Sequence, residues 1–108
     1  MPVSERREAP VAQQVPVVRL IGEYDVYSAS ALAEMLQPIT GRGIVDLTAV
    51  RYLDSAGLAQ LARLANRVGP HAVVLVAPNP QIRRVLALAR FDRLFVVVDE
   101  LDDARRVL

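Results

Sequence analysis

Short apolar runs alternate with amphipathic helical patterns along this chain, and that alternation restricts the possible folds more than any other feature. The longest apolar runs, residues 72–77 and 94–98, suit buried strands and are far shorter than the roughly 20 residues of a membrane-spanning helix. The strand–helix order occurs about four times, with short connections. Because such crossovers are right-handed and bring successive strands together, we predict an α/β domain with a mostly parallel sheet of four to five strands and about four helices.

Glycine, proline and asparagine mark where the predicted elements begin and end. Pro38 stops the first helix, Gly69-Pro70 stops the second, and Asn79-Pro80 opens the third. The predicted strands are 17–21, ended by Gly22, then 44–48, 71–77 and 94–98, and the predicted helices are 28–37, 55–68, one that starts at 79–80 and one that starts at 99–100. The inward-facing helix residues are expected to be Leu32, Met35 and Leu36, then Leu58, Leu61, Leu64, Ala65 and Val68, then Ile82, Val85, Leu86 and Ala89, and finally Leu101, Ala104 and Leu108.

The start of the chain differs from the rest. Residues 1–14 have no clear hydrophobic period, and proline interrupts them. We predict a tail over 1–14, with a weak edge strand at 7–13, and one folded domain over 15–108. A chain of 108 residues supports one hydrophobic core but not two domains. Hydrophobic residues make up 53% and aromatic residues only 5%, so the core must consist of Val, Leu, Ile and Ala, as in parallel sheets covered on both faces.

The charge balance bears on the possible partners. Thirteen basic and twelve acidic residues leave a net charge of +1. A nucleic-acid-binding domain normally carries a clustered basic stripe, so we expect no direct contact with nucleic acid. The polar first ten residues lack the apolar centre of a signal peptide, and we therefore expect a cytoplasmic protein without a membrane partner.

The residue types needed for enzymatic chemistry are scarce. There is no cysteine, which excludes disulfides, thiol catalysis and cysteine zinc sites, and His71 is the only histidine. The acidic cluster at 99–103 is explained better as the start of a helix than as a metal site. No nucleophile–base pair or metal-ligand set can be assembled from these residues. We therefore expect that the chain is not an enzyme and that it has no catalytic residue, no metal and no cofactor.

Two basic segments have simple explanations. Gly41-Arg42-Gly43 lacks the length, the lysine and the following helix of a phosphate-binding loop. Four arginines near the third helix are explained by a solvated helix face; they are Arg83, Arg84, Arg90 and Arg93.

One serine lies where an apolar strand pattern ends and an amphipathic helix begins, in Asp54-Ser55-Ala56-Gly57-Leu58. Serine is among the best N-cap residues, so the simplest interpretation is that Ser55 caps the helix. The alternative is that a partner reaches its hydroxyl. A phosphate there would add about −1.5 to −2 charges at the positive end of the helix dipole, which the fold should tolerate and a docked partner should not. From the residues alone both interpretations stay open.

Three segments together resemble the STAS domains of bacterial anti-sigma factor antagonists. They are Leu20-Ile21-Gly22-Glu23-Tyr24-Asp25, then Val45-Asp46-Leu47-Thr48-Ala49-Val50, then Leu53-Asp54-Ser55-Ala56-Gly57-Leu58. The Gly-Glu-x-Asp element alone is weakly specific, but its spacing from Asp-Leu-Thr and Asp-Ser-x-Gly-Leu is fairly specific. The resemblance covers residues 15–108 and implies a STAS-like fold.

The resemblance implies an anti-sigma factor antagonist, which binds an anti-sigma factor and so frees a sigma factor. In that family the anti-sigma factor is also a serine kinase, which uses ATP to phosphorylate the serine after the aspartate, Ser55 here. Phosphorylation breaks the complex, and a metal-dependent serine phosphatase restores the free form. Asp25 matches the aspartate that shapes the phosphorylation loop. The implied partner-binding residues are Glu23, Asp25, Asp54, Ser55, Ala56, Gly57 and Leu58.

Two features depart from the family pattern. The usual first strand would fall where Pro10 lies, and position 56 is alanine where many relatives carry a second hydroxyl. Ala56 therefore leaves Ser55 as the single candidate acceptor in this loop. The alternative function is a non-phosphorylated STAS subunit of a transport or lipid-trafficking complex, in which Ser55 is only a helix cap.

Overall fold

A single parallel sheet organises the molecule. The computed structural model of the chain describes residues 15–108, so the predicted edge strand at 7–13 lies outside the described residues. The strand order is β1-β2-β3-β4, and each neighbouring pair is parallel. The strands are β1 (Val17–Tyr24), β2 (Gly43–Leu53), β3 (Val73–Val76) and β4 (Val96–Val98). The helices are α2 (Ala29–Met35), α3 (Ser55–Val68), α4 (Pro80–Leu88) and α5 (Leu101–Val107), with a 3-10 turn, η2 (Phe91–Arg93), before β4.

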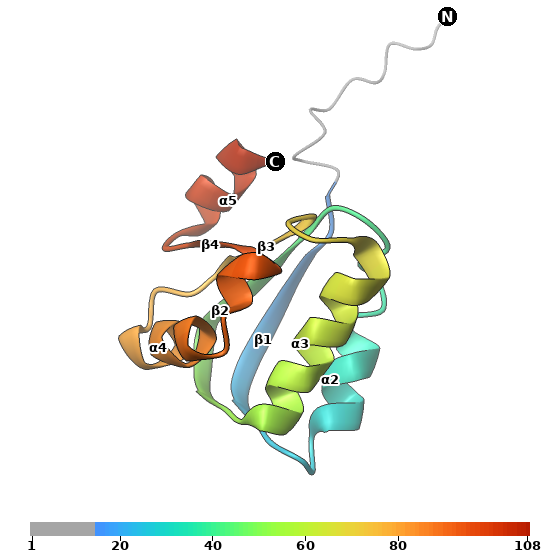
Figure 1. Cartoon of the computed structure of the whole chain (residues 1–108), viewed down its shortest axis with the longest axis vertical. Helices are drawn as coiled ribbons and strands as arrows, with labels where there is room; N and C mark the ends of the chain where they lie inside the picture. The colour runs from blue at the N-terminus through green and yellow to red at the C-terminus, as the bar shows by residue number, and fades with distance from the viewer. Residues whose placement is uncertain (1–14) are drawn as a thin grey trace, which may run out of the picture.

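Helices cover one face of the sheet throughout, and α5 covers the β3–β4 part of the other face, which confirms the predicted α/β class (Figure 1). Side chains of α2, α3, α4 and η2 share the larger apolar cluster on one face. On the other face α5 packs over β3 and β4, where Ala104 is buried against Ile44, Val74 and Val76. Strands with apolar side chains on both faces explain why the composition is so rich in Val, Leu and Ile.

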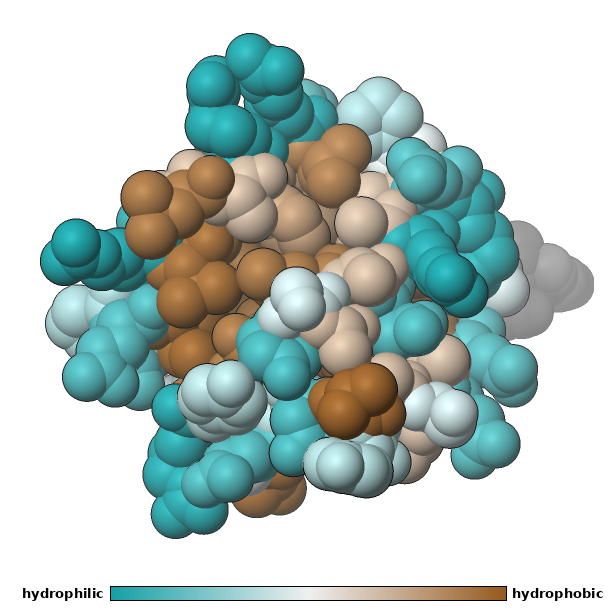
Figure 2. Space-filling model, turned by 60° about the horizontal axis from the view of Figure 1, so that its bottom comes forward, coloured by the Kyte–Doolittle hydropathy of each residue, from teal (hydrophilic) through white to brown (hydrophobic). Residues whose placement is uncertain are grey.

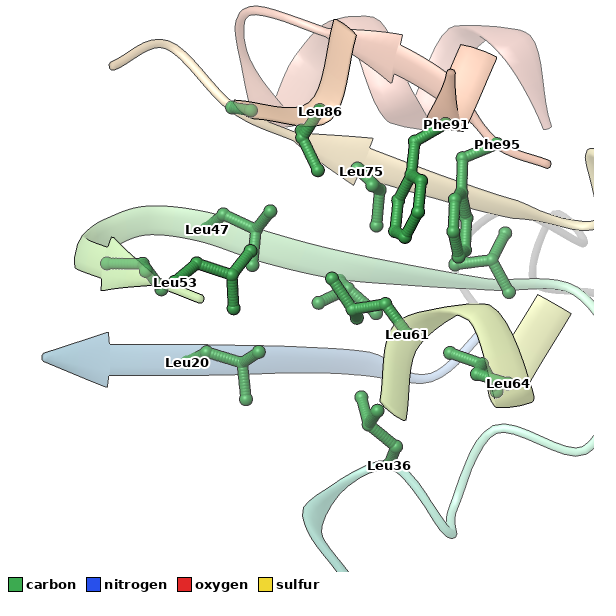
Figure 3. Packing of buried hydrophobic residues seen from close by; sticks show 14 of the residues in the cluster. Leu20, Leu36, Leu47, Leu53, Leu61, Leu64, Leu75, Leu86, Phe91 and Phe95 are labelled. Atoms are coloured by element: carbon green, nitrogen blue, oxygen red, sulfur yellow. The ribbon is translucent and has the colours of Figure 1, made fainter. Parts of the chain in front are cut away.

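The main core lies between the sheet and α3. Leu20, Leu47 and Leu75 come from three neighbouring strands and lie on the side of the sheet that faces Leu61 and Leu64 of α3 (Figure 3). All five side chains are almost fully buried. Burying each such leucine contributes roughly 1.5–3 kcal/mol relative to exposure, so this row fixes α3 firmly on β1 and β2.

The β4 end of the core contains an element that the sequence pattern did not predict. The rings of Phe91 in η2 and Phe95 lie with their centroids 5.6 Å apart. The apolar run at 94–98 was expected to be strand throughout, but only Val96–Val98 is. The first two residues of the run instead close the turn, because the backbone N–H of Phe95 donates to the Phe91 carbonyl oxygen at 2.9 Å.

Helix boundaries agree with the sequence where proline, glycine or asparagine sets them. α3 ends before Gly69, whose φ of 102° suits glycine, and α4 begins after Asn79, whose side chain caps the helix as predicted. The predicted helix at 28–37 is shorter, Ala29–Met35. Met35 and Ala89, expected to face inward, are exposed because they lie at or just beyond the last turn of their helices.

The first two strands are longer than predicted. β1 continues through Gly22, which has a φ of 93° and lies between two register shifts, at each of which β2 contains one extra residue. Gly22 therefore lies within an irregular stretch of the β1–β2 ladder and does not end the strand. The Tyr24 hydroxyl oxygen accepts from the backbone N–H of Ile21 at 3.1 Å. On β2 the Asp46 carboxylate accepts from the Thr48 N–H and hydroxyl at 2.9 and 2.5 Å. These side chains supply hydrogen bonds that the irregular ladder lacks.

The four strands differ in length, and this difference determines which loops extend beyond the sheet. β1 and β2 contain 8 and 11 residues, while β3 and β4 contain 4 and 3. β2 runs on after its last pairing with β3, which joins Asp46 and Val76. The carboxyl ends of β1 and β2 therefore project beyond the rest of the sheet, at the lower end of the view in Figure 1.

Candidate functional site

The projecting ends of β1 and β2 bring the predicted site residues together. Tyr24 and Leu53 are paired at the ends of the two strands, and the backbone N–H of Asp54 donates to the Tyr24 carbonyl oxygen at 3.2 Å. Asp25 follows directly after β1 and Asp54 directly after β2, so the two loops leave the sheet side by side. Two sequence segments that are about thirty residues apart thus form one surface, as parallel pairing requires.

The α3 helix is capped by Asp54, not by Ser55. Asp54 is still extended, with φ −101° and ψ −170°, and its Oδ1 accepts from the N–H groups of Ala56 at 2.8 Å and Gly57 at 3.3 Å. The prediction that Ser55 is the N-cap is therefore wrong. The physical reason is position: the last non-helical residue directs its side chain toward the free N–H groups, and here that residue is the aspartate.

Ser55 is the first residue of α3 and is exposed. None of the hydrogen bonds found among residues 15–108 involves its hydroxyl. The fold therefore does not use this hydroxyl, which remains available to a partner. His71 lies at the opposite edge of the sheet, before β3, where its Nε2 is 2.9 Å from the Asp92 carbonyl oxygen, so it cannot act as a base for Ser55.

Asp25 shapes the loop after β1. Its Oδ1 accepts from the N–H groups of Tyr27 at 2.9 Å and Ser28 at 3.2 Å, and the Ser28 hydroxyl accepts from the Asp25 N–H at 2.9 Å. These reciprocal bonds close a tight turn over residues 25–28. The turn leaves Val26 and Tyr27 exposed, and no role was predicted for either residue. The sequence feature that points to them is their position, since two apolar residues stand between the turn-forming residues Asp25 and Ser28.

Gly57 allows α3 to approach the end of β1. It is buried, and a Cβ atom in its place would lie 2.5 Å from Cδ1 of Leu53 and 3.2 Å from the Tyr24 carbonyl oxygen. Any larger side chain would push the helix start away from the strand ends. Gly57 thus lies beneath the surface that the exposed Ser55 occupies, while Leu58 is half-buried against the core.

The surface around Ser55 is acidic. Glu23, Asp25 and Asp54 all lie at this end of the molecule. Arg51 lies beside Glu23, with 3.8 Å between Arg51 Nη2 and Glu23 Oε2, and both of these side chains are largely exposed. Its single positive charge offsets one of the three negative charges, so these residues together remain acidic.

The other charged clusters have local partners. Arg83 pairs with Asp99 at 2.8 Å, and Asp103 pairs with Arg106 at 2.7 Å, which agrees with solvated helix faces. Over residues 15–108, no three His, Asp or Glu side chains come close enough together to hold a metal ion. A pocket of about 340 Å³ lies beside α4, η2 and β4 and is lined by Arg83, Leu86, Ala87, Asp92 and Val97. Among the described helices, none combines the length and the hydropathy needed to cross a bilayer.

Several known proteins are similar to this chain in sequence and in fold. An anti-sigma-F factor antagonist, RsfB, of Mycobacterium tuberculosis is 32% identical over 95 residues, which cover 83% of this chain and 78% of that protein. The crystal structure of an anti-sigma factor antagonist from Mycobacterium paratuberculosis superposes with a TM-score of 0.75 at 32% identity, covering 84% of this chain and 82% of the other. SpoIIAA of Bacillus, in its phosphorylated form, shares the fold at 20% identity with a TM-score of 0.59, over 85% of this chain and 89% of the other. Residues 6–104 match the family model of the STAS domain, and the chain therefore belongs to the STAS domain family.

Proposed function

We propose that this chain is an anti-sigma factor antagonist and that phosphorylation of Ser55 turns its binding off. The observation that carries the proposal is the division of roles at the start of α3: Asp54 caps the helix, and the exposed Ser55 hydroxyl makes no hydrogen bond within the part of the chain that the structure describes. A group that the fold does not need can be modified without unfolding the domain. Relatives named anti-sigma factor antagonists, 32% identical over most of the chain, support the same function.

In this proposal the chain is a binding module in the cytoplasm, and its partners perform the chemistry. The anti-sigma factor is a serine kinase that holds ATP. The Ser55 hydroxyl oxygen attacks the γ-phosphorus, the bond from that phosphorus to ADP breaks, and a base on the kinase takes the hydroxyl proton. A serine phosphatase hydrolyses the phosphate ester again. While unphosphorylated, the chain occupies the anti-sigma factor and so frees a sigma factor.

The proposed docking surface consists of the exposed parts of both loops. Glu23 and Ser55 are its exposed members, and Asp25, Asp54, Ala56 and Leu58 are half-buried members. Gly57 contributes from below, because it sets how closely α3 approaches β1. A partner that covers this surface must also cover the Ser55 hydroxyl.

Phosphorylation would concentrate negative charge at this surface. The Asp54 carboxylate already occupies the N–H groups of Ala56 and Gly57, so a phosphate on Ser55 would add its charge beside Asp54 rather than replace it. A phosphoserine carries about −1.5 to −2 charges at pH 7, held in water by strong hydration. Docking would require removal of that hydration and would bring the phosphate against a partner surface shaped for a neutral hydroxyl.

The first test is the site of phosphorylation. The full chain is incubated with a purified anti-sigma factor kinase and ATP, and the product is analysed by intact-mass and peptide mass spectrometry. We expect one phosphate, on Ser55, and none on the Ser55→Ala variant. Ser30→Ala is the matched control, because Ser30 is also exposed and lies in the first turn of α2. Absence of label, or label on another residue, rejects the proposed switch.

The second test is affinity. By calorimetry, Ser55→Ala should bind the kinase constitutively, and the phosphorylated chain and Ser55→Asp should bind more weakly. A loss of about 2–3 kcal/mol corresponds to a roughly 30- to 150-fold weaker Kd. Equal binding by Ser55→Ala and Ser55→Asp contradicts an electrostatic switch. Binding to transporter or lipid-trafficking subunits, without any kinase, would support the alternative function of a non-phosphorylated STAS subunit.

A further inference from the structure

Tyr27 is the most exposed large hydrophobic side chain of the described residues, and Val26 beside it is also open to solvent. Their exposed fractions are 92% and 65%. Neither residue belongs to an apolar core cluster within 15–108. A single exposed apolar side chain is common on protein surfaces, but Val26 and Tyr27 are adjacent in one short turn and both are largely open to solvent, so together they offer apolar area that a partner could bury.

The backbone that presents this ring is held in place. The Tyr27 N–H donates to Asp25 Oδ1 at 2.9 Å, and Ser28 is bound to Asp25 through its N–H, at 3.2 Å, and through its hydroxyl. Ser28 then leads directly into α2, whose Leu32 is fully buried. The turn is therefore anchored at both ends. A tyrosine on a fixed backbone loses little conformational entropy when it binds, which favours its use as an anchor.

The exposed pair is continuous with the surface around Ser55. Asp25 and Asp54 follow directly on the paired residues Tyr24 and Leu53, so the turn at 25–28 and the start of α3 are neighbouring loops of one edge. Figure 2 looks toward this end of the molecule: a broad apolar area lies on the left of the view, and a smaller, separate apolar group lies below the centre among polar atoms. A partner that covers Ser55 therefore meets the Asp25 turn as well.

The charges around the pair argue against a second copy of this chain as the occupant. A two-fold contact would place the same patch against itself, so the acidic side chains Glu23, Asp25 and Asp54 of one copy would face the acidic group of the other. Like charges brought together in this way are destabilising. The exposed pair and the acidic residues around it instead suit a partner protein that has an apolar pocket for the pair and basic residues at the rim of that pocket.

We propose that Tyr27, supported by Val26, is the apolar anchor by which this chain docks into a pocket of the anti-sigma factor. The inference rests on the proposed function and adds the residue that supplies most of the affinity. Anchors of interfaces are typically single Tyr, Trp or Arg side chains near a polar surround, and their truncation costs about 2 kcal/mol or more. In this arrangement Tyr27 provides affinity and Ser55 provides control.

The test separates anchoring from phosphorylation. All variants are made in the full chain with Ser55→Ala, so that no phosphate can form, and binding to the purified anti-sigma factor kinase is measured by calorimetry. Tyr27→Ser should weaken binding about 30-fold, which corresponds to about 2 kcal/mol. Tyr27→Phe keeps the ring and should bind like the parent. Thermal unfolding should be unchanged in both, because the side chain is exposed.

Val107→Ser is the matched control. Val107 is an exposed apolar residue, 53% accessible, but it lies on α5 and on the other side of the sheet. A loss of less than about tenfold for Tyr27→Ser, or an equal loss for Val107→Ser or Tyr27→Phe, overturns the inference while leaving the proposed function intact. Self-association that Tyr27→Ser abolishes would also overturn it, since a second copy would then be the occupant. If the parent binds no such kinase, the proposed function fails first and the anchor fails with it.

Discussion

Helices α3 and α4 begin at the same edge of the sheet and in the same manner, yet only α3 carries a candidate switch. Asp54 Oδ1 accepts from the Ala56 N–H at 2.8 Å, and Asn79 Oδ1 accepts from the Gln81 N–H at the same distance of 2.8 Å. In each helix the residue before the first turn satisfies the free backbone groups. The first helical residue is therefore relieved of any capping role in both.

The two helices differ at their first and third positions. The first residue is Ser55 in α3 and Pro80 in α4, and only the serine offers a hydroxyl. The third residue is buried in both, but it is Gly57 in α3 and Ile82 in α4. Ile82 fills the space between helix and sheet, whereas Gly57 lets α3 approach the Tyr24 carbonyl oxygen. At the start of α3, Asp54 supplies the cap and Gly57 the close approach to β1, so neither task falls to the Ser55 side chain.

The largest effect should come from making α3 resemble α4 at the third position. Gly57→Val would place a branched side chain where a single Cβ already lies 2.5 Å from Leu53 Cδ1 and 3.2 Å from backbone. We expect the free energy of unfolding to fall by about 2–3 kcal/mol, a drop in Tm of roughly 10 °C, measured by thermal unfolding. Gly41→Val is the control, because nothing lies within 4 Å of a Cβ there, and it should change stability by less than about 0.5 kcal/mol. Equal losses in the two variants would mean that α3 does not depend on this close approach.

The fold was predictable where a local residue decides the outcome. Gly69-Pro70 and Asn79-Pro80 set the helix ends correctly, and the alternation of strand and helix predicted the parallel sheet. The lengths of β1 and β2 were not predictable in the same way. Gly22 was predicted to end the first strand, but β1 continues through it to Tyr24, whose hydroxyl oxygen accepts from the Ile21 N–H. The shifted register with β2 that accompanies this continuation belongs to the paired strands and not to any local sequence signal.

The candidate site was predicted in position but not in its internal roles. Aspartate and serine are both good N-caps, and the pair Asp54-Ser55 does not reveal which of them is the last extended residue. The choice depends on where β2 ends, which its bulges decide. Tyr27 was missed for a related reason: the turn formed by Asp25 and Ser28, and not the tyrosine itself, determines that the ring is exposed.

An intermediate effect should separate the two caps. Asp54 accepts from two N–H groups, while Asn79 accepts from one. Asp54 also carries a negative charge at the positive end of the helix dipole. We expect Asp54→Ala to lower the free energy of unfolding by about 1.5–2 kcal/mol and Asn79→Ala by about 1 kcal/mol, measured by urea denaturation. A larger loss for Asn79→Ala would contradict the assignment of Asp54 as the stronger cap.

The smallest effect is the most informative one. Ser55→Ala removes a hydroxyl that is exposed and without a bond among the described residues, and alanine favours helices, so the free energy of unfolding should change by less than about 0.5 kcal/mol. If Ser55 were the cap, the same substitution would cost about 1 kcal/mol, as at Asn79. Urea denaturation of Ser55→Ala beside Asn79→Ala distinguishes these outcomes directly. A loss equal to that of Asn79→Ala would make the serine structural, because a hydroxyl that stabilises the helix start is not free to serve as a switch. An unchanged stability, combined with loss of phosphorylation in the same variant, would mean that the hydroxyl serves the partner alone.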